Sequence, residues 1–449
     1  MGNTTQQFFQ NMVAEQHRGC AVGVPSICSA NRFVLEAAVE EARRNGTPVL
    51  IESTSNQVDQ FGGYTGMTPA QFVRFVQDVT AGAGLPSGQV ILGGDHLGPN
   101  AWREERASEA MEKARGLVRA YVEAGYTKIH LDASMHCADD PGDRHHPLSV
   151  LTVAERAADL CTAAESAVAA GAAECAPVYV IGTEVPVPGG AQERLEEVAA
   201  TRVEDAAETV EVTREAFFNR GLHDAWERVI AVVVQPGVEF GDNAVVAYDR
   251  QKAAPLARWI ETVEGLVYEA HSTDYQTGTA LREMVQDHFA ILKVGPWLTF
   301  AFREAVFALA QIEAEWLGGR KSVELSRLPE VLERVMVADP EHWRKHYHGS
   351  EHELRLARRY SYSDRSRYYW PQADVQQALA RLCANLEDAQ PPLTLLSQYL
   401  PSQYHAVRKG ALANTPGELV GDRIAEVIRM YNSATLQSSR SRVERLPSP

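Results

Sequence analysis

This sequence is poor in cysteine, in positive charge and in long apolar runs. Its 449 residues include six cysteines with no CxxC pair, which excludes a disulfide scaffold and a zinc finger and favours the reduced thiols of a cytoplasmic protein. No run approaches the roughly 18 apolar residues of a membrane span, and residues 1–17 lack the apolar core of a signal peptide. Because 59 acidic residues outnumber 43 basic ones, the net charge of −16 makes nucleic acid and anionic membranes poor partners.

Short β-rich runs alternate with helical patterns over residues 1–317. Strands that alternate with helices imply right-handed crossovers and a parallel sheet. Eight such units match the length of an α/β fold of the (β/α)8 class, the TIM barrel, and their regularity favours a closed barrel over a doubly wound open sheet. The predicted strands lie within residues 21–29, 48–55, 89–96, 128–134, 177–185, 230–237, 265–273 and 289–296.

Residues 318–449 lack strand-like runs and carry amphipathic helix patterns such as VELSRLPEVLERVMVAD. We therefore predict a catalytic barrel over residues 1–317 and a helical C-terminal extension over 318–449 that packs on it. Residues 342–370 are basic and aromatic, and we expect their aromatic side chains to pack on the barrel. Alternatively, one cluster in this stretch reaches a phosphate or closes a subunit contact in a homo-oligomer: Arg365, Arg367 and Tyr368.

Polar side chains gather where most of the predicted strands end. In a TIM barrel the carboxyl ends of the strands face the active site, and an unpaired polar group on a buried strand costs about 1–3 kcal/mol. Polar residues at so many strand ends therefore predict an active-site rim. We expect a substrate to contact these members of it: Glu52, Asn56, Ser134, Ser272, Thr273, Asp274 and Lys293.

Two imidazoles and a carboxylate at three different strand ends predict a catalytic metal site with an open position: His96, Glu184 and His271. Such a ligand set suits Zn²⁺ best and Mn²⁺ passably. Asp95, which precedes His96, is then a natural general acid or base at a polarised carbonyl or alkoxide. We interpret His130, by contrast, as a packed histidine that faces the surrounding helices.

Long strings along the chain resemble the GatZ/KbaZ family of tagatose-bisphosphate aldolase subunit proteins, which are relatives of the class II aldolase barrels. They include GVPSICSAN, LGGDHLGPNAW, HLDASM, EAHSTDYQT and LKVGPWLTFAFREA. The resemblance implies a (β/α)8 barrel with a C-terminal extension that acts on tagatose-type ketose phosphates in galactitol and tagatose catabolism. It also implies that Asp95 is the acid/base and that His96 and His271 bind the metal.

The chain departs from the class II aldolase pattern at two places. Tagatose-type aldolases carry a third metal histidine at the fifth strand, where this chain reads GTE and offers Glu184. Their glycine-rich phosphate turns after the seventh and eighth strands are changed here to HSTDYQT and VGPWLT. Ser272, Thr273 and Gly295 are the remaining candidate donors in these turns.

The resemblance implies one of two function classes. Some family members are described as non-catalytic partners that stabilise the aldolase catalytic subunit, and others resemble an enzyme that epimerises tagatose 6-phosphate at C4 to fructose 6-phosphate. We predict the metal-dependent epimerase, because a stabilising partner has no need of a polar catalytic rim. Cleavage of the C3–C4 bond, rotation of the aldehyde and re-addition would invert C4.

Inversion of this kind needs a proton carrier on each face of C4. Asp95 is the candidate for one face and Asp132 for the other, with Glu184 as the alternative if it is not fully committed to the metal. The sequence leaves open whether the sugar carries one phosphate, two or none, and whether the chain acts without a partner subunit.

Overall fold

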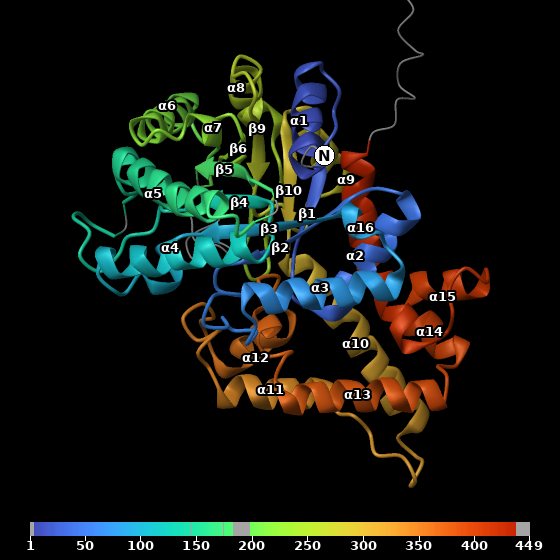
Figure 1. The fold of residues 1–449 in the computed structure, drawn as a ribbon. Helices are drawn as coiled ribbons and strands as arrows, with labels where there is room; N and C mark the ends of the chain where they lie inside the picture. The colour runs from blue at the N-terminus through green and yellow to red at the C-terminus, as the bar shows by residue number, and fades with distance from the viewer. Residues whose placement is uncertain (1–3, 145, 174, 183–197, 437–449) are drawn as a thin grey trace, which may run out of the picture.

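The computed structural model describes residues 4–144, 146–173, 175–182 and 198–436, and among them eight parallel strands close into a barrel (Figure 1). The ring closes where the last strand pairs with the first. This topology confirms the predicted TIM barrel, and each predicted run overlaps one strand. The barrel strands are β1 (Val24–Cys28), β2 (Val49–Thr54), β3 (Val90–Leu97), β4 (Lys128–Leu131), β5 (Val178–Gly182), β6 (Val229–Val233), β9 (Val267–Ala270) and β10 (Phe289–Val294).

A helix follows each barrel strand in the chain, and local signals set where these helices start and stop. Asn31 accepts hydrogen bonds from the N–H groups of Phe33 and Val34 at the start of the first one, and Gly46 ends it with φ 64°. A hairpin of β7 (Glu239–Phe240) and β8 (Val245–Val246) follows β6. The helices are α2 (Arg32–Asn45), α3 (Pro69–Ala83), α4 (Ala107–Glu123), α5 (Val150–Ala169), α6 (Val203–Asn219) with the short α7 (His223–Trp226), α8 (Arg250–Ile260), α9 (Gly278–Gln286) and α10 (Pro296–Leu317).

The chain beyond α10 forms the helical extension, whose last helix returns to the barrel wall and contacts α2, α9 and α10. Buried Asp364 fixes the extension to the barrel, since it accepts hydrogen bonds from Thr299 (2.6 Å) and Arg303 (3.2 Å) of α10. The domain boundary after residue 317 stays a prediction. The extension helices are α11 (Leu328–Ala338), α12 (Glu351–Tyr360), α13 (Ala373–Asp388), α14 (Leu393–Tyr399), α15 (Pro401–Arg408) and α16 (Pro416–Thr435).

The first helix, α1 (Thr4–His17), closes the amino-terminal end of the barrel. Its residues Phe9, Met12 and Val13 are buried in one apolar cluster with Leu50 and Ile91 from the strands. Figure 1 shows α1 at one end of the barrel and helices α11 to α13 beyond the other end. The barrel therefore has an apolar floor, and its open mouth faces the C-terminal extension.

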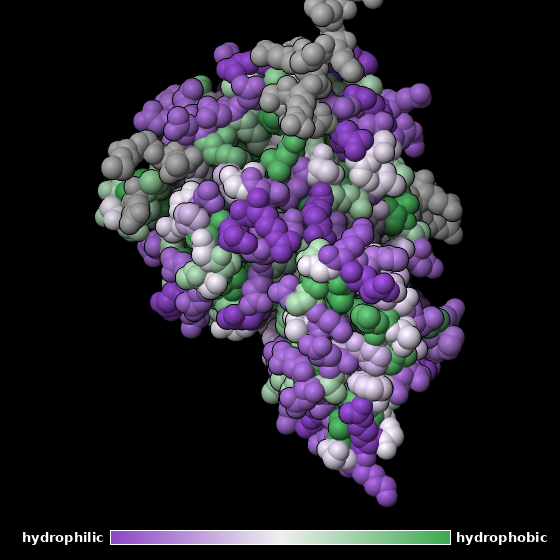
Figure 2. Space-filling model, turned by 90° about the vertical axis from the view of Figure 1, so that its right-hand side faces the viewer, coloured by the Kyte–Doolittle hydropathy of each residue, from purple (hydrophilic) through white to green (hydrophobic). Residues whose placement is uncertain are grey.

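Of the helices that the structure describes, none combines the length and the apolarity needed to cross a bilayer. Figure 2 shows one face of the molecule, on which hydrophilic side chains predominate and apolar side chains lie in small groups. Scattered apolar residues of this kind are normal on a protein surface.

We expect Phe9→Ala to lower the free energy of unfolding by about 3–5 kcal/mol, because the ring fills the floor of the barrel and its loss leaves a cavity. Urea unfolding measures this change. Phe61→Ala is the matched control, since that ring is 71% exposed, and it should change stability by less than about 1 kcal/mol. Equal effects of the two substitutions would contradict a structural role for α1.

Candidate active site

A cavity of about 470 Å³ lies at the carboxyl ends of the strands, between the barrel and the C-terminal extension. Most of the predicted site residues line it: Asn56, Asp95, His96, His271, Ser272, Asp274 and Lys293. Four other predicted residues do not line it: Glu52, Asp132, Ser134 and Thr273. Glu184, predicted as a metal ligand and as a proton carrier, lies outside the described residues.

The string GGDH at the end of β3 brings an acid and an imidazole to the cavity. The two glycines leave room for neighbours: a Cβ atom on Gly93 would lie 2.6 Å from Cγ of Glu52, and one on Gly94 would lie 2.7 Å from the ring of Tyr121. His96 has φ 50°, in the left-handed region that non-glycine residues rarely adopt. Such strain persists where the surrounding structure imposes one orientation, and here that orientation places His96 at the cavity.

Each of the two histidine rings at the cavity is held by a carboxylate. Nδ1 of His96 donates to Oδ2 of Asp132 (2.7 Å), and Nε2 of His271 donates to Oε1 of Glu269 (3.0 Å). This pairing leaves the other nitrogen of each ring to bind a metal, which is the usual arrangement around metal-binding histidines. Burial lowers the pKa of His271 to about 4, so its ring is neutral at neutral pH, as a metal ligand must be.

A buried ion network fills the centre of the barrel behind the cavity. Nζ of Lys128 lies 2.7 Å from Oε1 of Glu52 and 2.6 Å from Oε2 of Glu269. Lys293 pairs with Glu52, and its Nζ lies 2.8 Å from Oδ1 of Asp95. Burial disfavours the charged form of Lys293, but the surrounding negative charge, that of Asp95 first, raises its pKa well above the usual range. The network therefore keeps the lysine charged and holds Asp95 at the edge of the cavity.

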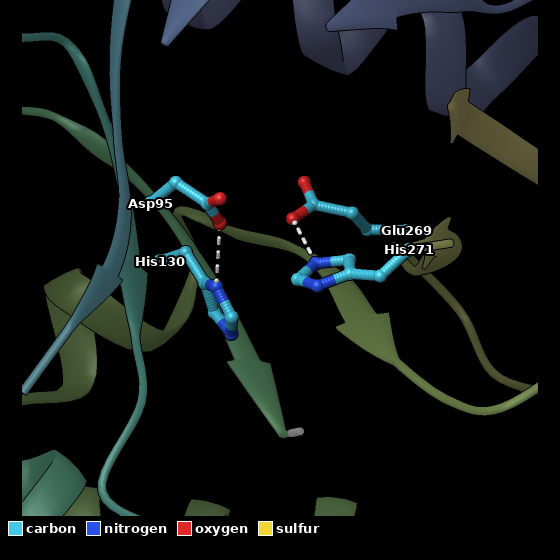
Figure 3. A group of neighbouring side chains, drawn as sticks. All are labelled: Asp95, His130, Glu269 and His271. Carbon is cyan, nitrogen blue, oxygen red and sulfur yellow. Dashed lines mark hydrogen bonds and ion pairs between the residues drawn. The ribbon is translucent and has the colours of Figure 1, made fainter. Parts of the chain in front are cut away.

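Asp95, His130, Glu269 and His271 converge on one point, with one ligand atom from each lying within 4.8 Å of the others (Figure 3). Nε2 of His130 donates to the carbonyl of Gly182 at 3.0 Å. Its Nδ1 accepts a hydrogen bond from the backbone N–H of His96 at 3.3 Å and lies 3.2 Å from Oδ1 of Asp95, an oxygen that also pairs with Nζ of Lys293. Imidazole nitrogens and carboxylate oxygens are ligands that Zn²⁺ takes in proteins, and these four converging side chains therefore fit a metal ion.

The charges inside the barrel also fit a divalent cation. Four buried carboxylates oppose the two lysines of the network, so negative groups outnumber positive ones by two as long as the imidazoles are neutral: Glu52, Asp95, Asp132 and Glu269. Burial disfavours the charged form of His96, yet Asp95 and then Asp132 outweigh burial and raise the pKa of this imidazole. A buried excess of negative charge is costly without a counter-ion, so the site attracts positive charge.

The prediction that His130 faces the helices is wrong. His130 is buried inside the barrel, and its ring centroid lies 5.1 Å from that of His96 and 5.3 Å from that of His271. Side chains two residues apart on a strand share a face, so Lys128 and His130 in the string KIHL point the same way. Lys128 and Glu269 were also missed, although both are polar residues alternating with apolar ones in otherwise buried strands.

The C-terminal extension supplies part of the cavity wall through Arg367, Tyr368 and Trp370. The ring of Tyr368 packs on that of Tyr64, from the segment after β2, with centroids 4.6 Å apart. The aromatic stretch therefore packs on the barrel, as predicted. Two of the three residues named as alternative phosphate ligands also face the cavity, whereas Arg365 does not line it.

One solved structure of another protein shares this fold closely, and two others are more distant. The crystal structure of a probable tagatose 6-phosphate kinase from Sinorhizobium meliloti is 47% identical in sequence, with a TM-score of 0.83 over 92% of this chain and 100% of its own. A fructose-bisphosphate aldolase from Campylobacter jejuni is 12% identical over 85% of this chain and 92% of its own, with a TM-score of 0.47. The YdjI aldolase from Escherichia coli is 14% identical over 67% and 84%, with a TM-score of 0.40. Likenesses as distant as the last two support no conclusion about fold or function.

One protein family matches nearly the whole chain. It is described as D-tagatose-1,6-bisphosphate aldolase subunit GatZ/KbaZ-like, and its match spans residues 9–436. The span includes every barrel strand and the extension helices up to α16. The chain therefore belongs to the GatZ/KbaZ-like family, as the resemblance of its motifs implied.

Proposed function

We propose that this chain is a metal-dependent epimerase that interconverts D-tagatose 6-phosphate and D-fructose 6-phosphate by inversion at C4. The observation that carries the proposal is the cavity between barrel and extension, where Asp95 meets two carboxylate-held histidines, His96 and His271. A route through cleavage and re-addition must retain both fragments and exclude water, which a covered cavity favours. The description of the Sinorhizobium meliloti relative also names tagatose 6-phosphate.

The cluster of Asp95, His130, Glu269 and His271 supports a divalent cation as the cofactor. The set predicted from the sequence shares only His271 with this cluster, and it suits Zn²⁺ best, with Mn²⁺ second. His96 and His271 would hold it from the cavity side, with Glu184 as the proposed third ligand. When bound, the cation would polarise the ketose carbonyl and stabilise the negative charge that develops as the C3–C4 bond breaks. Asp132 and Glu269 orient the two imidazoles for this task.

Asp95 is the proposed base at C4. Burial alone would raise its pKa, but the positive charges of His96 and Lys293 outweigh burial and hold that pKa well below its usual range, so the carboxylate is ionised. Asp95 takes the proton of the C4 hydroxyl, and the C3–C4 bond breaks. The electron pair of this bond passes to the three-carbon fragment as an enediolate, and the other fragment becomes an aldehyde.

The extension keeps the aldehyde in the cavity while it rotates and presents its opposite face. The enediolate then re-forms the C3–C4 bond, and the new C4 alkoxide takes up a proton from the other side. Asp132 does not suit this second transfer, because its carboxylate accepts hydrogen bonds from His96 (2.7 Å) and from the hydroxyl of Ser134 (2.7 Å) away from the cavity. We therefore assign Asp132 a positioning role and retain Glu184 as the second proton carrier.

The alternative function is that of a non-catalytic subunit that stabilises a class II D-tagatose-1,6-bisphosphate aldolase. A test on the purified, metal-loaded chain alone separates the two functions. The epimerase converts tagatose 6-phosphate to fructose 6-phosphate without any partner, as product analysis by chromatography would show. Absence of turnover, together with a longer half-life of a separate aldolase subunit on mixing, would establish the stabilising role instead.

We expect Asp95→Asn to lower kcat by roughly 10²–10⁴, the usual weight of general acid–base catalysis, because the amide cannot accept the C4 proton. Steady-state kinetics with metal content measured on the same sample checks this. Asp78→Asn, on the exposed face of α3, is the control and should leave kcat unchanged. A near-normal kcat in a fully metal-loaded Asp95→Asn enzyme would remove Asp95 from the mechanism.

Asp132→Asn should weaken metal binding by roughly 10- to 100-fold, because the amide no longer fixes the tautomer and orientation of the His96 ring. A positioning role predicts that saturating metal restores most of kcat in this variant, whereas it does not restore kcat in Asp95→Asn. Metal titration followed by activity distinguishes the two roles. A kcat that stays about 100-fold low at saturating metal would return Asp132 to proton transfer.

A further inference from the structure

The turn after β10 holds a carboxylate where many barrels of this fold hold a phosphate. In TIM barrels the loops after the seventh and eighth strands, with the start of the next helix, frequently form a phosphate site. Here these strands are β9 and β10, and α10 starts directly after Gly295. The backbone N–H groups of Gly295 and Trp297 both donate to Oδ1 of Asp274, at 3.1 Å and 2.7 Å. The donors that would hold a phosphate are therefore already occupied.

Asp274 also repels a phosphate by its charge. Its side chain is buried, with 3% of the residue exposed, and it lines the cavity. It follows His271 by three residues and so lies near the metal-binding end of the cavity. In the orientation required by the proposed epimerase, C1 and C2 of the ketose bind at this end. A carboxylate there accepts a hydrogen bond from a C1 hydroxyl and disfavours a C1 phosphate.

The opposite charge comes from the extension. Three cations line the cavity, and two of them have carboxylate partners: Arg32 with Glu36 at 3.1 Å, and Lys293 with Asp95. The third is Arg367, whose guanidinium donates to backbone carbonyl oxygens and to the hydroxyl of Tyr368 (3.1 Å). Among the described side chains no carboxylate forms an ion pair with Arg367.

Arg367 is thus a half-buried cation that forms no ion pair with a described carboxylate, although its charge opposes the rise that burial causes in the pKa of Asp274. Its guanidinium carbon lies 4.7 Å from the centroid of the Tyr368 ring, which fixes it against an aromatic face. A buried or half-buried charge is normally paired, so this arrangement implies an anion from outside the chain. A planar guanidinium recognises a phosphate by two parallel hydrogen bonds.

We propose that the cavity selects a ketose monophosphate, with Arg367 binding the phosphate on C6 and Asp274 excluding a phosphate on C1. This inference rests on the proposed function for the orientation of the sugar. It assigns the two ends of the substrate to different parts of the chain, since Asp274 belongs to the barrel and Arg367 to the extension. A 1,6-bisphosphate, the aldolase-type substrate, would place one phosphate on an occupied and negatively charged turn.

Equilibrium binding to the metal-loaded chain by calorimetry tests this selection without reliance on turnover. The ligands are tagatose, tagatose 6-phosphate and tagatose 1,6-bisphosphate. We expect the 6-phosphate to bind roughly 10- to 100-fold more tightly than the free sugar, the range for charge-assisted contacts. The bisphosphate should bind at least about 10-fold more weakly than the 6-phosphate, because like charges meet at Asp274.

Substitutions of Arg367 and of Asp274 should change different ratios of binding affinity. Arg367→Gln should abolish the advantage of the 6-phosphate over free tagatose without weakening free tagatose, and Arg367→Lys should restore part of it. Arg32→Gln is the matched control, because that arginine already has a carboxylate partner, and it should preserve the advantage. Asp274→Ser should reduce the difference in binding affinity between the 6-phosphate and the bisphosphate. Thermal unfolding would confirm that each variant is folded.

Two results would overturn the inference: a bisphosphate that binds wild-type chain as tightly as the 6-phosphate, or a folded Arg367→Gln variant that keeps the full preference for the 6-phosphate. Failure of the proposed function would give a different result. The chain would form no product, yet it would still bind the 6-phosphate more tightly than the other two ligands. Selective binding without turnover would thus retain the ligand site and reject the epimerase.

Discussion

The ion network of Lys128 and Lys293 with their carboxylate partners is the constraint on which the site depends. Charges in a barrel interior are tolerated only in pairs with close contacts, and removal of one partner leaves an uncompensated charge. The same carboxylates have second tasks, since Glu269 also orients the ring of His271. Glu52 in turn needs the space that Gly93 leaves. The candidate catalytic side chains are therefore held in place by buried groups whose charges also balance one another.

The barrel interior changes from apolar at the α1 end to charged in the centre and polar at the cavity. The floor is closed by the apolar face of α1, the centre holds the ion network, and the mouth opens into the cavity below the extension. A partner protein that only stabilises another subunit could fill this interior with apolar side chains at no loss of stability. The buried carboxylates are therefore consistent with the proposed cation and the proposed reaction.

The extension covers the mouth of the barrel and also supplies a charged side chain to the cavity. Asp364 anchors it to α10, and this anchor lies three residues before Arg367, which lines the cavity. Barrel residues thus supply the proposed acid/base and the imidazoles, and the extension supplies Arg367, a cation without an ion pair among the described side chains. In the proposed mechanism the chemistry therefore depends on the geometry of the strand ends, while recognition of the distant end of the substrate depends on how the extension packs.

The sequence by itself determined the barrel and the edge at which the site lies. Eight alternating units predict the fold, and Asp95, His96 and His271 were found because the carboxyl ends of parallel strands meet at one rim whatever the details of packing. The polar alternation in KIHLD could also have placed His130 inside. Tertiary structure alone decided the partners: Asp132 on His96, Lys128 between Glu52 and Glu269, Asp274 on the turn of Gly295, and Arg367 at the cavity. These contacts join residues far apart in the chain, and they depend on the stagger of the closed barrel and on the path of the extension, which no local periodicity records.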